Sequence, residues 1–343
     1  MIKVLVVDDS SFMRKSLAHI LETDPSITVV DTADNGEEAV IKAERLRPDV
    51  VLLDLSMPVM DGLAALAQIM ASRPTPVLVL SGLAKKDATV AFRALEHGAV
   101  DYIAKPSGVI SYDIERLRSE IILKVRNAAA ADVGKLLRWM PALLPAPART
   151  ARDGGGSIVV LGASTGGVNA LPLVLSGLPR DMKSALLVVQ HMSLEFIPHL
   201  AERLKRACAL PVAIARKDAV VVPGQVLVAP GGCHTVIARH EGTVKIRFTR
   251  KNAASHLSPS VDLAMESAAA VYGERTVGVL LTGMGADGAR GMCAVKDAGG
   301  ATIAQDESSC VVFGMPKAAI EAGCVDQVLP LPKIADAILS KAS

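Results

Sequence analysis

Three polar residues of the kind that hydrolyse esters and amides occupy corresponding places in the second half of the chain. Ser164, His191 and Asp287 each come at or shortly after the end of an apolar run. These runs alternate with helical patterns, which predicts buried parallel strands. Because ligands of open α/β sheets bind outside the carboxyl ends of the strands, we expect the three side chains to converge at one sheet edge. A hydroxyl nucleophile, an imidazole base and a carboxylate that orients the base could act together there.

The segment around Ser164, residues 162–166, has the pattern G-x-S-x-G. A strand-to-helix turn of this kind exposes the hydroxyl beside the N–H groups of a helix N-terminus. A phosphate-binding loop is the alternative interpretation. However, the chain has Ser164 where a dinucleotide-binding motif needs glycine, and Val168 where a P-loop needs lysine. Gln190 and His191, rather than an acidic residue, end the following strand, so the pattern favours a hydrolase.

His191 is the histidine that follows a buried-strand pattern in this half of the chain. His199 lies on a helical pattern, and His234 and His240 flank a group of short strands. A core or capping role for His191 stays open, as does an N-cap role for Asp287 on the helix that follows it. The order Ser, His, Asp along the chain differs from that of α/β-hydrolases, which indicates a different α/β scaffold.

A second polar cluster is predicted in the first 110 residues, where Asp8, Asp9, Asp54, Ser81 and Lys105 each come at the end of an apolar run. Carboxylates brought together at one sheet edge repel each other, and a hard cation such as Mg2+ relieves this with oxygen ligands. Asp54 is central and is the candidate nucleophile for a phosphoryl group. The cation and Lys105 would neutralise the added charge, and Ser81 could donate a hydrogen bond to it. Exposed loop carboxylates beside an unrelated lysine are the alternative.

Strand and helix patterns alternate five times in residues 1–125, which predicts a parallel sheet with helices on both faces. Proline-rich and glycine-rich composition then indicates a linker over residues 126–156. Residues 157–343 again alternate, so we expect a second doubly wound α/β domain. Short strands at residues 225–228, 235–238 and 244–248, with no helices between them, predict a small antiparallel insertion at the sheet edge.

The composition excludes several classes of protein. A formal net charge of +2 argues against a dominant nucleic-acid-binding surface. The five cysteines are scattered without a CxxC pair, so we expect free thiols in a reducing cytosol and neither a zinc site nor a disulfide framework. The chain starts with a strand pattern rather than a signal peptide, and no apolar run approaches the ~18 residues of a membrane span. These features predict a cytoplasmic protein without direct membrane insertion.

The first 125 residues resemble the receiver domain of two-component response regulators, through Asp8, Asp9, Asp54, Ser81 and Lys105 at the ends of their strands. The resemblance implies a flavodoxin-like fold. It also implies that a histidine kinase is the phosphodonor to Asp54, and that Asp8, Asp9 and Asp54 bind Mg2+. Ser81 and Lys105 would respond to the phosphoryl group.

Two further features of this domain are an aromatic residue and a peptide bond near the predicted acidic pocket. Tyr102 matches the aromatic switch position of receiver domains, although a strand aromatic packed under a helix would have the same sequence pattern. The bond between Lys105 and Pro106 is prone to the cis form, which would fix the lysine loop.

The second domain resembles the catalytic domain of the chemotaxis protein-glutamate methylesterases. The matching motifs are residues 162–167, 190–192, 259–262, 281–288 and 310–316. The resemblance implies hydrolysis of glutamyl γ-methyl esters, and deamidation of certain glutamines, on methyl-accepting chemoreceptors, with no cofactor for the esterase chemistry. It places the catalytic triad on Ser164, His191 and Asp287, and the oxyanion-binding amides around Thr165 and Met284.

Two departures from the methylesterase motifs could alter substrate contacts or loop geometry. The first is His256-Leu257-Ser258-Pro259, with an apparent extra residue, and the second is Ala286 where asparagine is frequent. Two other functions compete with a methylesterase. A DNA-binding regulator would need a helical output module with a recognition helix, which the strand-rich second half argues against. A catalytically silent scaffold that binds chemoreceptor-like partners stays open.

Overall fold

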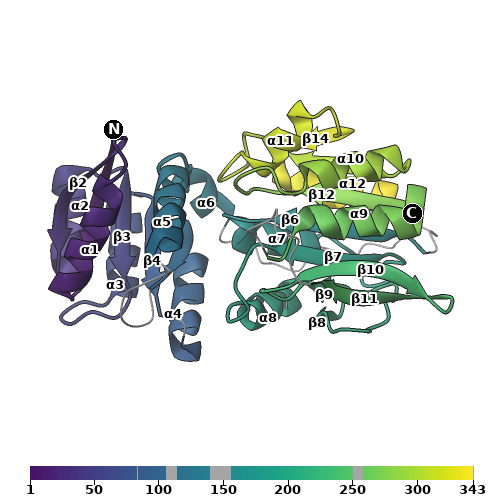
Figure 1. Cartoon of the computed structure of the whole chain (residues 1–343), viewed down its shortest axis with the longest axis horizontal. Coiled ribbons are helices and arrows are strands. Elements are labelled where there is room, and N and C mark those ends of the chain that lie inside the picture. The colour runs from purple at the N-terminus through teal and green to yellow at the C-terminus, as the bar shows by residue number, and fades with distance from the viewer. Residues whose placement is uncertain (83, 106–113, 140–155, 250–257, 343) are drawn as a thin grey trace. The chain divides into compact units, whose positions relative to one another are not determined.

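The computed structural model describes residues 1–82, 84–105, 114–139, 156–249 and 258–342. The chain forms two compact units, Met1–Met140 and Pro141–Ser343 (Figure 1). Among the described residues, no helix has the length and apolar character that a membrane span requires.

The first unit contains a parallel sheet of five strands in the order β2-β1-β3-β4-β5. Its strands are β1 (Ile2–Val7), β2 (Ile27–Ala33), β3 (Val50–Asp54), β4 (Val77–Ser81) and β5 (Asp101–Ala104). Its helices are α1 (Ser11–Glu22), α2 (Gly36–Leu46), α3 (Gly62–Ser72), α4 (Lys85–Glu96), α5 (Ile114–Ala129) and α6 (Val133–Trp139). Every residue of β3 and of β4 is buried, as expected for parallel strands with helices on both faces.

The first three helices of this unit each begin directly after a capping residue. Ser10, Asn35 and Asp61 accept hydrogen bonds from the first-turn N–H groups of α1, α2 and α3. The first compact unit also extends past residue 125, where the sequence placed the start of the linker. Val125 on α5 and Leu136 on α6 are buried, so apolar residues continue the packed structure towards residue 139.

The second unit contains a parallel sheet of seven strands in the order β14-β13-β12-β6-β7-β9-β8. Its strands are β6 (Ile158–Ala163), β7 (Ala185–Gln190), β8 (Val212–Ile214), β9 (Val226–Val228), β12 (Thr276–Leu280), β13 (Ala301–Gln305) and β14 (Gln327–Leu329). Its α-helices are α7 (Gly167–Ser176), α8 (Ile197–Ala207), α9 (Val261–Tyr272), α10 (Ala289–Asp297), α11 (Met315–Glu321) and α12 (Ile334–Lys341). Two short 3-10 helices are η1 (Gly273–Arg275) and η2 (Leu331–Lys333).

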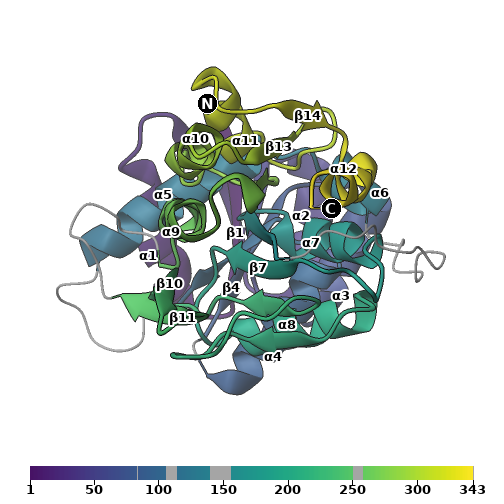
Figure 2. The same ribbon diagram turned by 90° about the vertical axis from the view of Figure 1, so that its right-hand side faces the viewer.

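A two-stranded antiparallel hairpin, β10 (His234–His240) and β11 (Thr243–Thr249), forms a separate small sheet. β10 lies beside α9 (Figures 1 and 2). The prediction that residues 225–228 belong to this insertion is wrong, because β9 pairs in parallel with β7 and β8. The misassignment arose because β8 has only three residues and no readable periodicity, so the parallel crossover that precedes β9 was not visible in the sequence.

A disulfide joins Cys293 on α10 to Cys324 just after α11, across a sequence separation of 31. The expectation of free thiols without a disulfide is therefore wrong for this pair, whereas Cys208, Cys233 and Cys310 form no disulfide within the described residues. The pairing depends on the packing of α10 against α11, which no short cysteine motif reports.

Candidate functional site

The turn that carries Ser164 is closed tightly between β6 and α7. The main-chain N–H of Ser164 donates to the carbonyl of Thr282, with the N and O atoms 3.1 Å apart. Gly166 has φ +84°, a left-handed conformation that favours glycine. A Cβ on Gly167 would lie 2.0 Å from Oε1 of Gln190. The glycines of G-x-S-x-G and the following residue are therefore required by close approach and backbone conformation, as the motif interpretation needs.

The adjacent strand β7 places His191 at the same edge as Ser164. Ala163 and Gln190 are register partners, so Ser164 and His191 each lie one residue beyond the paired strand ends. The side-chain amide of Gln190 donates to the carbonyl of Ser164 at 2.8 Å and to that of His191 at 3.3 Å. Gln190 thus ties the two strand ends together. In the described part of the chain, Ser164 makes its hydrogen bonds through the main chain, and none joins its Oγ to His191.

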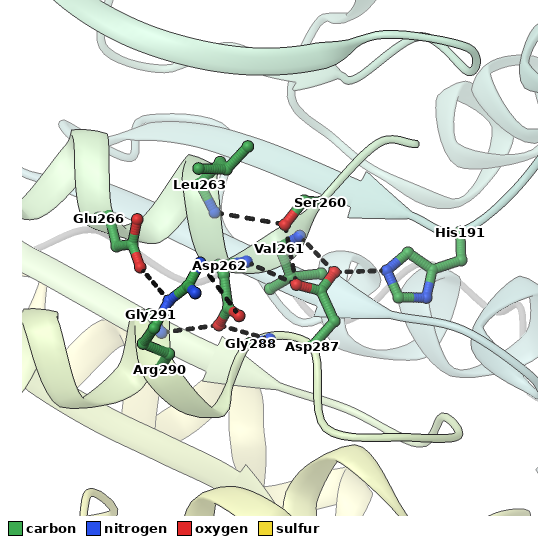
Figure 3. A network of polar contacts seen from close by, with 10 residues as sticks. All are labelled: His191, Ser260, Val261, Asp262, Leu263, Glu266, Asp287, Gly288, Arg290 and Gly291. Atoms are coloured by element: carbon green, nitrogen blue, oxygen red, sulfur yellow. Dashed lines mark hydrogen bonds and ion pairs between the residues drawn. The ribbon is translucent and has the colours of Figure 1, made fainter. Parts of the chain in front are cut away.

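Asp287, in the loop after β12, meets the imidazole of His191. Nε2 of His191 lies 2.7 Å from Oδ2 of Asp287, and the two side chains are 9% and 10% exposed (Figure 3). Because Asp287 engages Nε2, Nδ1 is the ring nitrogen left to exchange a proton with a nucleophile. The strand order β12-β6-β7 therefore brings an imidazole and the carboxylate that it contacts to the edge that carries Ser164.

The N-terminus of α9 also binds Asp287. The N–H of Val261 donates to Oδ2 at 2.7 Å, and the N–H of Asp262 and the hydroxyl of Ser260 donate to Oδ1 at 3.1 and 2.8 Å (Figure 3). A helix N-terminus stabilises negative charge in this way. The alternative that Asp287 is the N-cap of α10, the helix that follows it, is therefore wrong. Asp287 binds the first turn of α9, whereas α10 has Gly288 as N-cap and no side-chain cap.

These contacts explain the acidity of Asp287. Burial by itself raises the pKa of this carboxyl, but the hydrogen bond and charge of His191, together with the N–H groups of Val261 and Asp262, outweigh burial and lower the pKa to about 2. Asp287 is therefore ionised at neutral pH and holds a donor tautomer at Nε2 of His191.

The sequence patterns place Gln190, Ser260 and Asp262 within motifs shared with the methylesterases but do not predict the hydrogen bonds that these residues make. Ser260 is the N-cap of α9 and accepts a hydrogen bond from the N–H of Leu263. A serine directly before an apolar helical pattern is a capping signal that could have revealed this. No sequence signal predicts that the capped helix would bind Asp287.

The two amide positions expected to bind an oxyanion lie beside Ser164. Thr165 is buried in the turn, and Met284 is half-buried in the loop after β12. This loop lies close to the serine, because a Cβ on Gly283 would be 2.8 Å from Cβ of Ser164. Within the described residues, no hydrogen bond uses the N–H of Met284. Ala286 is exposed in the same loop, while His256 and Leu257 lie outside the described residues.

The acidic pocket of the first unit places one ammonium between two carboxylates. Nζ of Lys105 lies 2.9 Å from Oδ2 of Asp8 and 2.9 Å from Oδ2 of Asp54. Asp8 and Asp54 are buried, and Asp9 is exposed. One oxygen from each of the three carboxylates lies within 4.8 Å of the others. This set of oxygen donors fits a hard cation such as Mg2+.

The charges in this pocket are incompletely compensated. Burial raises the pKa of Asp54, and the hydrogen bond and charge of Lys105 do not fully offset it. Burial alone lowers the pKa of Lys105, but its hydrogen bonds to Asp54 and Asp8 outweigh this and raise it. Two buried carboxylates share one lysine, so an additional cation would be favourable here.

Ser81 and Tyr102 lie on the neighbouring strands. Ser81 lines a pocket of about 160 Å³ with Asp54 and Lys105, and its hydroxyl donates to the carbonyl of Gly82. Tyr102 is buried on β5, and its ring centroid lies 4.6 Å from Nζ of Lys124. Pro106 lies outside the described residues.

Comparison with known proteins assigns each part of the chain to a family. Residues 4–115 match the response regulator receiver domain, and residues 159–338 match the CheB methylesterase family. The second match contains Ser164, His191 and Asp287, and the first contains Asp8, Asp9, Asp54, Ser81 and Lys105.

Relatives match over almost the whole chain. A protein from Symbiobacterium thermophilum named protein-glutamate methylesterase/protein-glutamine glutaminase is 45% identical, over 98% of this chain and 96% of its own. A protein of the same name from Halalkalibacterium halodurans is 43% identical, over 98% and 97%. The crystal structure of the Thermotoga maritima CheB methylesterase catalytic domain is 40% identical, with a TM-score of 0.53, over 54% of this chain and 98% of that one. The chain therefore belongs to the CheB methylesterase family, with a response regulator receiver domain at its N-terminal end.

Proposed function

We propose that this protein is a phosphorylation-regulated serine hydrolase. Its substrates are glutamyl γ-methyl esters, and also certain glutamine amides, on methyl-accepting chemoreceptors. The observation that carries the proposal is the 2.7 Å hydrogen bond between the side chains of His191 and Asp287, which lie beside the strand end that carries Ser164. The names of the relatives supply the substrate class.

The chemistry follows from the orientation of the imidazole. Nδ1 of His191 takes the proton of Ser164 as Oγ forms a bond to the ester carbonyl carbon. The same nitrogen returns the proton to the leaving oxygen, and methanol departs. Water, deprotonated by Nδ1, then cleaves the acyl-serine bond and restores Ser164. Asp287 stabilises the charged imidazole at each step through Nε2.

The oxyanion that forms during each attack is assigned to the N–H groups of Thr165 and Met284. Both lie in loops packed around Ser164, at the N-terminal side of α7 and after β12. A preorganised donor of this type stabilises the transition state by roughly 3–4 kcal/mol.

The receiver supplies control. Asp54 is the proposed phosphorylation site, with a chemotaxis histidine kinase as the donor. Asp8, Asp9 and Asp54 would hold Mg2+, which neutralises charge on the phosphoryl group when bound. Lys105 would form an ion pair with that group, while Ser81 donates a hydrogen bond and Tyr102 reports the change as a switch residue.

The proposal places the protein in the cytoplasm, where kinase and receptor domains are accessible. It assigns the receiver to residues 1–125 and the methylesterase domain to 157–343. The linker, 126–156, begins within the packed helices α5 and α6. A catalytically silent scaffold that binds chemoreceptor-like partners is the second candidate. The observation in its favour is that Ser164 Oγ makes no hydrogen bond to His191 within the described residues.

Methanol release from a methylated receptor cytoplasmic fragment separates these two functions. Ser164→Ala is expected to lower the rate by about 10³-fold or more, because the nucleophile is removed. Ser176→Ala is the matched control, since Ser176 ends α7 and its hydroxyl donates to the carbonyl of Leu173. Undiminished release by Ser164→Ala would contradict the assignment, and no release by the wild type would favour the scaffold.

A further inference from the structure

We infer that Asp262 is a positioning residue for the catalytic pair, because it fixes the start of α10 and thereby keeps Asp287 within reach of His191. This inference deepens the proposed function and rests on the assignment of Asp287 to the active site.

Reciprocal hydrogen bonds from carboxylates connect the N-termini of α9 and α10 (Figure 3). Asp287, which precedes α10, accepts hydrogen bonds from the N–H groups of Val261 and Asp262 at the start of α9. Asp262 in turn accepts hydrogen bonds from the N–H groups of Gly288 and Gly291, at the start of α10, each at 2.8 Å. The carboxylate of Asp262 on α9 therefore binds N–H groups at the start of α10, and the carboxylate of Asp287, just before α10, binds those at the start of α9.

The turn from Asp287 into α10 has glycine at the N-cap position, so the N-cap residue has no side chain that could cap the helix. Gly288 has φ +98°, and a Cβ there would lie 2.6 Å from Leu280 and 2.9 Å from Val261. It is the N-cap of α10 and makes no side-chain cap. The carboxylate of Asp262 takes over this role, so its removal would release the residue next to Asp287.

The helices also approach closely at this point. A Cβ on Gly291 would lie 2.7 Å from Cβ of Met265 and 3.1 Å from the Cα of Asp262. With so little space between the backbones, the carboxylate of Asp262 reaches Gly288 and Gly291 together through Oδ1. The contact is part of a packed junction rather than of a surface loop.

The charge of Asp262 opposes the arrangement that its hydrogen bonds support. Burial raises the pKa of Asp262, and the nearby charge of Asp287 raises it further, while the N–H groups of Gly291 and Gly288 act in the opposite direction. Arg290 gives weak compensation, because its Nη2 lies 3.7 Å from Asp262 and its Nε is engaged by Glu266 at 2.6 Å. Asp262 thus acts through the acceptor geometry of Oδ1, which an asparagine oxygen can reproduce.

The test compares Asp262→Ala, Asp262→Asn and wild type as full-length proteins. Asp262→Ala is expected to lower kcat for methanol release by about 10- to 100-fold with little change in KM, because a small displacement of a catalytic group has effects of this size. Asp262→Asn is expected to restore most of the rate. A merely structural role would reduce the folded fraction without this selective effect on kcat and without rescue by asparagine.

Asp326→Ala is the matched control for a lost carboxylate acceptor. Asp326 accepts hydrogen bonds from the N–H and hydroxyl of Thr302 at the start of β13, at the sheet edge opposite the active site. It is expected to lower the midpoint of thermal unfolding and to leave kcat of the folded enzyme unchanged. Wild-type kcat in Asp262→Ala, or an equal loss in Asp326→Ala, would overturn the inference.

A second readout does not depend on the substrate. The proton shared by Nε2 of His191 and Oδ2 of Asp287 is expected to give a downfield 1H NMR resonance, assigned by its loss in His191→Ala. Asp262→Ala should abolish or shift this resonance, while Asp262→Asn and Asp326→Ala keep it. If the wild type released no methanol, the proposed function would fail and this resonance alone would decide the inference: an unchanged or undetectable resonance across the series would overturn it.

Discussion

The two polar sites of this chain occupy equivalent places in two parallel sheets and have opposite electrostatic character. Asp54 at the end of β3 and Asp287 after β12 are carboxyls with 5% and 10% of their side chains exposed, and each lies beside a basic side chain. The pKa of Asp54 lies above its ordinary value because burial dominates. The pKa of Asp287 is lowered to about 2, because hydrogen bonds and the charge of His191 outweigh burial.

The number of donors accounts for the difference. Asp287 accepts hydrogen bonds from His191, Ser260 and two N–H groups of a helix N-terminus. Asp54 accepts a hydrogen bond from the N–H of Leu55 and shares the ammonium of Lys105 with Asp8, so it has fewer donors. A carboxylate whose charge is fully satisfied can orient a base through many turnovers. A carboxylate in an undercompensated pocket is suited to changes of charge, by cation binding and by phosphorylation.

The largest expected effect is on Asp287. Asp287→Ala is expected to lower kcat for methanol release by about 10⁴-fold, because the tautomer and orientation of His191 are no longer held. Asp297→Ala, at the exposed end of α10, is the control and should retain the wild-type rate. A loss below tenfold in Asp287→Ala, measured by steady-state kinetics, would mean that His191 works without its carboxylate.

The next effect is on stability in the receiver. Lys105→Met is expected to reduce the free energy of unfolding by about 3–5 kcal/mol, because two buried carboxylates lose their shared partner. Denaturant unfolding measures the loss, and Mg2+ should restore more stability to this variant than to the wild type. Lys317→Met, which removes a lysine with a largely exposed side chain, is the control. Equal free energies of unfolding for the two variants would show that Lys105 is not needed to compensate the charges of Asp8 and Asp54.

A smaller effect, of opposite sign at the two sites, concerns the pH dependence of stability. The depressed pKa of Asp287 contributes about 2 kcal/mol to stability above pH ~4, and this is lost as the pH falls from ~4 towards 2. Asp287→Asn should therefore flatten that acid limb. The raised pKa of Asp54 means that its ionised form costs stability at neutral pH, so Asp54→Asn should stabilise the protein at pH 7 and show no effect below pH ~4.

Unfolding curves from pH 2 to pH 7 measure both variants. If Asp54→Asn and Asp287→Asn changed the free energy of unfolding at pH 7 in the same direction, the two sites would not differ in electrostatic character.

The sequence predicts the parts of the fold that repeat a strong pattern. Fully apolar runs before Ser164, His191 and Asp287 are the buried strands β6, β7 and β12, and the strand order places the residues that follow them at one edge. The short strand β8 and the parallel pairing of β9 were missed, because three residues carry no period.

The parts of the site that the sequence leaves out depend on contacts between distant segments. Ser260 and Asp262 bind Asp287, Gly288 and the first turn of α10, which lie 25 to 29 residues further along the chain. The disulfide of Cys293 and Cys324 likewise follows from helix packing. Local spacing carries none of this information, because the partner of a cap or a cysteine is set by the tertiary fold.

In the proposed function, charge added at Asp54 controls chemistry at Ser164. The most direct test is methanol release from methylated receptor fragments with and without acetyl phosphate and Mg2+, for wild type, Asp54→Asn and Ser164→Ala. The account predicts phosphodonor-stimulated release by the wild type, unstimulated release by Asp54→Asn and none by Ser164→Ala. Equal stimulation of wild type and Asp54→Asn would contradict it.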